Sequence, residues 1–163
     1  MRNHRRSTVA ATIAATVLTG LISAGPSGAV APATEAERVT AGKYGRGIFN
    51  ATNKRRDENS LRAFRDSACL HEFAVRKARR MARVERMGDH SHPGPAMRKC
   101  NLAGWAENLA EGYPTGRAAV RGWMRSQGHR ENILNRDLRL IAVAARQGRS
   151  GRWYAIQVFG TRA

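Results

Sequence analysis

One stretch of the chain has a strong helical pattern of apolar positions. Between Ser67 and Met87, apolar side chains return every three or four residues, while arginine and lysine occupy the opposite face. Ser67 is suited to cap this helix at its start, and Gly88 to end it. We therefore predict an amphipathic helix over residues 67–87 that packs against a core. Its apolar stripe is formed by Leu70, Phe73, Ala74, Ala78 and Met81.

Weaker patterns predict two further helices. Residues 35–54 have helical character, although several glycines lower their helix propensity. Thr115 is a good cap for a helix that ends near Arg125. The intervening residues 89–95 contain two prolines, so we expect an irregular loop there.

The strand signals lie mainly in the second half of the chain. Residues 103–110 are compatible with a short strand, and residues 138–145 and 153–159 are rich in residues that favour strands. A glycine-containing turn over residues 147–151 joins the last two segments as a hairpin. Helices followed by a hairpin predict an α+β domain in which helices pack on an antiparallel sheet.

The N-terminal residues have the pattern of an export signal. Arginines come first, an uncharged run over residues 7–25 follows, and small residues lie after it. We predict a signal peptide over residues 1–29, with cleavage after Ala29 or Ala31, and a disordered tether over residues 30–34. An uncleaved membrane anchor is the alternative that this pattern leaves open.

The chain is strongly basic. Its formal net charge of +17 becomes +14 without residues 1–29, since that segment holds three arginines and no acids. Such a charge favours contact with acidic wall polymers or anionic lipid. The arginines are scattered and are not interleaved with aromatic residues, so we expect no dedicated nucleic-acid site.

The two cysteines, Cys69 and Cys100, both follow the export signal. An even number of cysteines in an exported chain predicts one disulfide, with two buried free thiols as the alternative.

The densest polar stretch is residues 128–134. His129 titrates near neutrality, whereas Arg130 and Asn132 carry donors that either line a site or brace a turn. The neighbouring Ile133 and Leu134 are expected to fix this stretch to the core.

A candidate site follows if distant residues converge. The residues are His129, Glu107 and either His90 or His92. Two imidazoles and a carboxylate can hold zinc or another divalent cation, or act as acid and base. No local metal-binding motif supports this set, so it depends on the three-dimensional fold.

Four segments occur along the chain in a characteristic order: His90-Ser91, Trp105-Ala106-Glu107-Asn108-Leu109-Ala110, Trp123 to Leu134, and Trp153 to Gly160. Together they resemble the CAP superfamily (cysteine-rich secretory, antigen 5 and pathogenesis-related proteins; the SCP domain) in its short bacterial form. The resemblance covers roughly residues 35–160, and we assign residues 35–163 to one CAP domain.

The resemblance implies a three-layer α-β-α sandwich with a central antiparallel sheet and a cavity lined by histidines and acids. Transferred residue by residue, the cavity residues are His90, Glu107 and His129, with His92 as an alternative to His90. A second acid of the family pattern is replaced by Ser126, which weakens a hydrolytic interpretation.

These observations favour a secreted or cell-surface binding module over an enzyme. Ser91 and Ser126 lie in no recognised nucleophile motif. The ligand is an unidentified extracellular molecule, and we expect a monomer. Zinc or another divalent cation is the cofactor that the histidines and the glutamate could hold, and no cofactor is certain from the sequence. The alternatives are a metal-assisted hydrolase that uses the same histidines and glutamate, and adhesion to acidic wall polymers through the basic surface.

Overall fold

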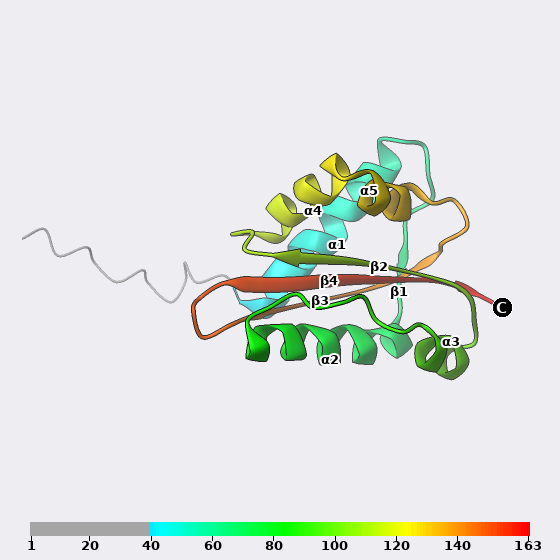
Figure 1. The fold of residues 1–163 in the computed structure, drawn as a ribbon. Helices are drawn as coiled ribbons and strands as arrows, with labels where there is room; N and C mark the ends of the chain where they lie inside the picture. Colours follow the sequence, from blue (N-terminus) through cyan, green and yellow to red (C-terminus); the bar gives the residue numbers. More distant parts are fainter. Residues whose placement is uncertain (1–39) are drawn as a thin grey trace, which may run out of the picture.

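A computed structural model describes residues 40–163, which form a sheet between two helical layers (Figure 1). This arrangement confirms the expected α-β-α sandwich. One layer contains α1 (Ala41–Asp57), α4 (Gly116–Arg125) and α5 (Gln127–Leu134). The other layer contains α2 (Ala68–Val84) and α3 (Gly94–Cys100).

The sheet has the strand order β1-β3-β4-β2. Its strands are β1 (Arg65–Asp66), β2 (Leu102–Glu111), β3 (Leu140–Gln147) and β4 (Trp153–Arg162). The pairs β2/β4 and β3/β4 are antiparallel, whereas β1 pairs parallel to β3. The sheet is therefore mixed rather than wholly antiparallel. The two-residue β1 carries no sequence pattern, because it arises where the chain crosses from the layer of α1 to that of α2.

The two long helices begin at side-chain caps. Thr40 Oγ1 accepts a hydrogen bond from Lys43 N (3.2 Å), and Ser67 Oγ accepts one from Leu70 N (3.4 Å). The predicted α1 residues before Thr40 lie outside the described part of the chain. The α2 helix ends at Val84 rather than near residue 87, since Glu85 adopts a left-handed conformation (φ 51°). The stop assigned to Gly88 was therefore wrong.

Residues 89–93 form the expected irregular loop, but two short helices that the sequence did not predict follow at residues 94–100 and 127–134. The α3 helix begins at Gly94 directly after Pro93, and Pro95 lies in its first turn. Prolines there remove no helical hydrogen bond, because the first N–H groups of a helix have no internal acceptor. The polar stretch over residues 128–134 lies in α5 rather than in a turn. Its short length leaves too little periodicity for the sequence to reveal a helix.

The core lies on both faces of the sheet. On the face covered by α1 and α4, Ile48, Trp123 and Phe159 are buried together. On the face covered by α2, Leu70 and Ile156 are buried in a second cluster. The central strand β4 is buried on both faces, which explains why its sequence is almost continuously apolar.

The disulfide between Cys69 and Cys100 is present, and it links the start of α2 to the end of α3. This confirms the expected pairing. The predicted signal peptide and tether lie outside the described residues. Within residues 40–163, no helix has both the length and the apolarity needed to cross a membrane.

Candidate functional site

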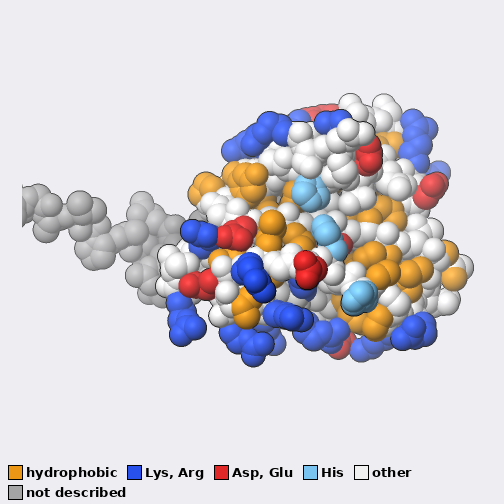
Figure 2. All heavy atoms as spheres, viewed as in Figure 1, with side chains coloured by type: hydrophobic (Ala, Val, Ile, Leu, Met, Phe, Trp, Pro, Cys, Tyr) orange, Lys and Arg blue, Asp and Glu red, His pale blue; other side chains and the backbone are white. Residues whose placement is uncertain are grey.

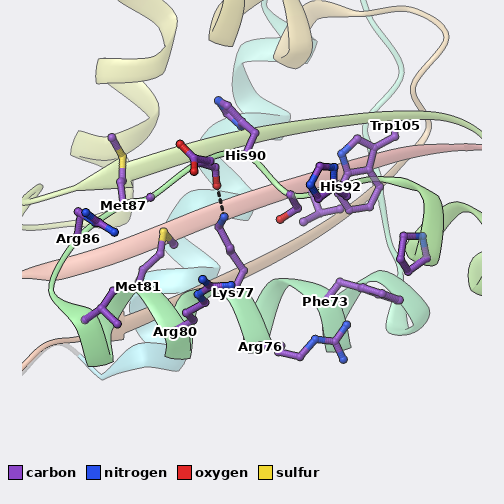
Figure 3. A pocket seen from close by; sticks show the side chains of 16 residues that line it. Phe73, Arg76, Lys77, Arg80, Met81, Arg86, Met87, His90, His92 and Trp105 are labelled. Carbon is purple, nitrogen blue, oxygen red and sulfur yellow. Dashed lines mark hydrogen bonds between the residues drawn. The ribbon is translucent and has the colours of Figure 1, made fainter.

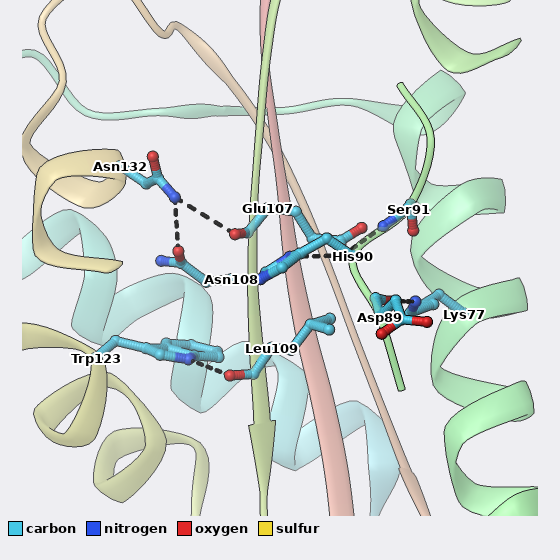
Figure 4. Close-up of polar contacts among 9 residues, drawn as sticks. All are labelled: Lys77, Asp89, His90, Ser91, Glu107, Asn108, Leu109, Trp123 and Asn132. Atoms are coloured by element: carbon cyan, nitrogen blue, oxygen red, sulfur yellow. Dashed lines mark hydrogen bonds and ion pairs between the residues drawn. The ribbon is translucent and has the colours of Figure 1, made fainter. Parts of the chain in front are cut away.

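A buried carboxylate connects the central sheet to the loop before α3 (Figure 4). Glu107, on β2, has a side chain only 2% exposed. Its Oε1 lies 3.2 Å from His90 Nδ1 and accepts a hydrogen bond from Ser91 N at 3.1 Å. The carboxylate thus fixes two consecutive loop residues to the sheet.

Both histidines that the sequence offered as partners of Glu107 lie on the loop, but in different positions. His90 contacts the carboxylate, and both His90 and His92 line the groove beside it (Figure 3). Within the described residues, His90 is thus the histidine that pairs with Glu107, while the groove itself is lined by both. Glu107 Oε2 is buried and has no hydrogen-bond partner within the described part of the protein.

An amide network holds α5 against β2. Asn108 Nδ2 donates to His129 O (3.1 Å) and to Gln157 Oε1 (3.0 Å). Asn132 Nδ2 donates to Asn108 Oδ1 (2.9 Å). Both Asn108 and Gln157 are fully buried, so the network replaces hydration that their amides lose on folding.

This network brings His129 into the neighbourhood of His90. The pKa of His129 is lowered by partial burial and, secondarily, by the charge of His90. Arg130 Nη1 donates to Met124 O (3.3 Å), which ties α5 to α4. The geometry gives Arg130 and Asn132 supporting contacts within the fold.

The groove beside His90 lies between α2 and the loop before α3 (Figure 3). We call it the α2 groove, and its volume is about 550 Å³. Its basic lining residues are Arg76, Lys77, Arg80 and Arg86. Its apolar lining includes Phe73, Met81, Val84, Met87 and Trp105. Lys77 Nζ donates to Asp89 O and so connects the two walls. The groove therefore combines positive charge with apolar surface.

The surface around this groove is unusual for the molecule. Val84 (52% exposed) and Met87 (37% exposed) are large exposed hydrophobic residues, and both line the groove. Figure 2 shows lysine and arginine side chains gathered along the side of the molecule formed by α2. Exposed apolar side chains beside concentrated charge are typical of a binding surface.

The candidate residues do not assemble a metal centre. Across residues 40–163, no group of three histidine, cysteine, aspartate or glutamate side chains is placed to hold an ion. One oxygen of Glu107 already accepts hydrogen bonds from the loop. The other oxygen has no hydrogen-bond partner there, but the described residues bring no set of three ligands together around it, and no step through a metal follows from this geometry.

Within residues 40–163, Ser91 and Ser126 do not have the hydrogen bond to a histidine that would activate a serine nucleophile. The Ser91 backbone N–H donates to Glu107, and the Ser126 backbone N–H donates to Trp123 O (3.1 Å). In the part of the chain that the structure describes, neither hydroxyl is hydrogen bonded to a histidine. The contacts of these two serines in the described residues are thus backbone contacts that position the loop before α3 and the start of α5.

Sequence reasoning missed the residues that organise this site. Asn108 and Gln157 were noted only as parts of longer motifs, although each is a polar residue within a largely apolar strand. That contrast was the available signal, because a buried amide persists only with partners. The apolar side of the α2 groove gave no such signal, since Val84 and Met87 continue the helical pattern.

Known proteins resemble both the sequence and the fold. Bacillus subtilis YkwD is 30% identical over 107 residues, which are 61% of this chain but only 41% of YkwD. The matched part is thus less than half of that relative. An extracellular SCP-domain protein of Bacillus anthracis superposes with a TM-score of 0.63 at 22% identity, covering 75% of this chain and 41% of that one. An outer surface protein of Borrelia burgdorferi gives a TM-score of 0.65 at 18% identity, covering 72% of this chain and 92% of that one.

These structural likenesses establish the fold, while the sequence establishes the family. Residues 49–159, more than half of the chain, match the model of the cysteine-rich secretory protein family. The Trp105 to Ala110 and Trp153 to Gly160 segments lie on the paired strands β2 and β4, where the resemblance placed the domain's central sheet. The chain belongs to the CAP family of cysteine-rich secretory proteins.

Proposed function

We propose that this protein is an extracellular binding module that holds an acidic polymer in the α2 groove. In this proposal, Glu107, His90 and His129 form the support of the binding surface and do not carry out a reaction. The ligand class is an anionic wall polymer, such as a chain of phosphodiesters.

The observation that carries this proposal is that the buried Glu107 carboxylate holds the loop before α3 in place. Its buried carboxylate accepts the Ser91 N–H and contacts His90, so it holds the loop that forms one wall of the groove. A buried charged acceptor that fixes a loop pre-organises a binding surface. A catalytic carboxylate would instead need to face substrate or water.

The charge of the groove supports an anionic ligand. Arg76 and Arg80 are one helical turn apart on the exposed face of α2, and Arg86 follows on the loop. Asp89 also lines the groove and adds one negative charge, and Arg76 is ion-paired with Glu72, so the four basic side chains still outnumber the acids. The exposed apolar area is limited to Val84 and Met87, which is little for insertion into a bilayer. A flexible polyanion therefore suits the surface better than a membrane.

The test measures binding of poly(glycerol phosphate) to the full chain at several salt concentrations. Changing Arg76→Gln together with Arg80→Gln should lower the affinity by at least about tenfold and reduce the salt dependence. The matched control is Arg121→Gln with Arg125→Gln, which removes the same charge from α4 in the opposite layer. Equal losses in the two double variants would show diffuse attraction and would contradict a groove. Preferential binding to phosphatidylglycerol vesicles would identify lipid instead.

A second experiment distinguishes whether Glu107 only supports the loop or contacts the ligand directly. Glu107→Gln keeps an oxygen that can accept the Ser91 N–H, so binding should fall little. Glu107→Ala removes that acceptor, so both the melting temperature and the affinity should fall. Loss of binding in Glu107→Gln without any change in melting temperature would show that the carboxylate contacts the ligand itself.

The metal-assisted hydrolase is the competing candidate, and it predicts a different result. It requires zinc to raise the melting temperature of the wild type but not of His129→Ala. Our proposal expects no such difference, because no three-ligand set is formed within residues 40–163. Stoichiometric zinc in purified protein, lost in His129→Ala, would favour the hydrolase.

The extracellular part of the proposal rests on the export pattern of residues 1–29 and on the family. It is supported by the extracellular and outer-surface descriptions of the Bacillus anthracis and Borrelia burgdorferi proteins. N-terminal sequencing of protein recovered from culture medium should begin at Val30 or Pro32. A chain retained in the membrane with residue 1 intact would show an anchor instead.

A further inference from the structure

The edge of the sheet at β3 is only partly covered. β1 pairs with β3 at Leu140 and Ile141 alone, and Ser67 N then donates to Ile141 O. Beyond that point, residues 142–147 of β3 are paired only with β4 within the described part of the chain. Because backbone groups at a strand edge alternate with a period of two, Val143 and Ala145 present the next free edge groups.

This edge lies at the bottom of a second groove, formed between α1 and α2. The groove has a volume of about 360 Å³, and we call it the edge groove. Its β3 lining is Val143, Ala144, Ala145 and Arg146. The opposite wall is formed by α1, where the small residues Ala41, Gly42 and Gly45 leave space for a ligand above the strand. A Cβ atom on Gly45 would meet only Val143 Cγ1, at 4.0 Å, so the space above this glycine is open.

The groove has opposite charges at its two ends. Asp66 lies at the end where it pairs with Ile141, and His71 lines the same groove. Arg146 lies five residues further along β3, and Arg46 lines the groove from α1, next to Gly45, which faces Val143. The half-buried Arg146 donates from Nη1 to Ala145 O, and an added strand would have to replace this hydrogen bond.

We propose that the edge groove binds the free C-terminal segment of a partner protein as an additional strand. The segment continues the line of β1 and runs parallel to β3. Its backbone pairs with Val143 and Ala145, and its terminal carboxylate lies at Arg46 and Arg146. About five extended residues span this distance, and small or β-branched side chains fit between the two helices.

The direction follows from charge complementarity. A strand parallel to β3 places its negative end beside the two arginines and leaves its preceding residues beside Asp66. An antiparallel strand would place the carboxylate beside Asp66, where like charges repel. An added strand would also form hydrogen bonds with the free backbone N–H and C=O groups of the edge, which most proteins cover in some way.

The probe is the acetylated pentapeptide Lys-Val-Thr-Val-Ala with a free carboxylate, added to the full chain. Hydrogen exchange at the Val143 and Ala145 amides should slow by at least about tenfold when the peptide saturates the protein. Amidation of its C-terminus, or Arg146→Gln in the protein, should weaken binding by about tenfold, because each removes a charge-assisted contact. Methylation of the peptide's backbone nitrogens should abolish binding.

Substitution of glycines tests the position of the site. Gly45→Leu should block the groove and prevent binding. Gly128→Leu is the matched control, because Gly128 is also helical and a Cβ there meets nothing within 4 Å, but it lies in α5 away from the groove. Unchanged binding in Gly45→Leu, or equal affinity for the amidated peptide, would overturn the proposal. Val143 and Ala145 amides already protected without peptide would show that the chain itself fills the edge, which would also overturn it.

Discussion

The guanidinium of Arg56 caps the end of α5, which lies 77 residues further along the chain. Its Nη1 atom donates to Ile133 O and to Asn135 O, both at 2.8 Å, and its Nε donates to Arg62 O at 2.7 Å. The side chain is fully buried and lies 3.8 Å from the centre of the Phe64 ring. A single side chain thus satisfies terminal carbonyl groups of α5 that the helix cannot satisfy itself.

Replacing Arg56→Leu should lower the free energy of unfolding by about 2–4 kcal/mol, because buried carbonyl oxygens would lose their donors. Denaturant unfolding measures this change. The control is Arg55→Leu on the same helix, which removes only a solvent-accessible ion pair with Glu58 and should cost less than about 1 kcal/mol. Similar losses in the two variants would argue against capping by Arg56.

Gly116 marks the closest approach of α4 to α1. A Cβ atom at this position would lie 2.3 Å from Tyr44 O and 2.7 Å from Ile48 N. These are backbone atoms, so Gly116→Ala must displace a helix and should cost about 1–3 kcal/mol or more.

Gly128→Ala provides the contrasting case, because a Cβ there meets nothing within 4 Å. In a helix, this change should stabilise the protein by up to about 1 kcal/mol. Thermal unfolding of both variants should therefore shift in opposite directions. Stabilisation by both substitutions would mean that the close approach of α1 and α4 does not limit position 116, and destabilisation by both would contradict the open space at Gly128.

The Cys69–Cys100 disulfide closes a segment with a sequence separation of 31. Reduction should lower the stability by about 3 kcal/mol, chiefly because the unfolded chain gains conformational freedom. Unfolding with and without dithiothreitol measures this difference. The double variant Cys69→Ala, Cys100→Ala should have the reduced stability and should not respond to the reductant. A response in that variant would point to a different target.

The lowered pKa of His129 predicts a pH dependence of stability. Burial, assisted by the charge of His90, holds this pKa below the ordinary value of about 6.5. The unfolded state then binds the proton more readily, so stability should fall as the pH drops below about 6.5.

Melting temperatures at pH 7.5 and pH 5.5 test this expectation. The decrease on acidification should be smaller in His129→Gln, which has no titrating imidazole. His71→Gln is the control, because His71 is exposed and its replacement should leave the decrease unchanged. An undiminished decrease in His129→Gln would assign the pH dependence to another group.

The sequence determined the elements whose signal is local. The cap at Ser67 and the apolar stripe of α2 placed that helix within three residues of its observed end. The turn between β3 and β4 was equally readable, because apolar segments with β-branched and aromatic residues flank a glycine-containing segment. The cysteine pairing followed from number alone, since two cysteines allow one bridge.

Tertiary structure decided the features that depend on partners distant in sequence. The loop holding His90 is placed by the Glu107 carboxylate, and α5 by Asn108 and Arg56. Helix α5 is too short to show a period, and β1 exists only because the crossing chain meets β3. The sequence therefore named His90, Glu107 and His129 as candidates. Only the fold showed that Glu107 contacts His90 and accepts the Ser91 N–H, because these hydrogen bonds join segments 16 and 17 residues apart.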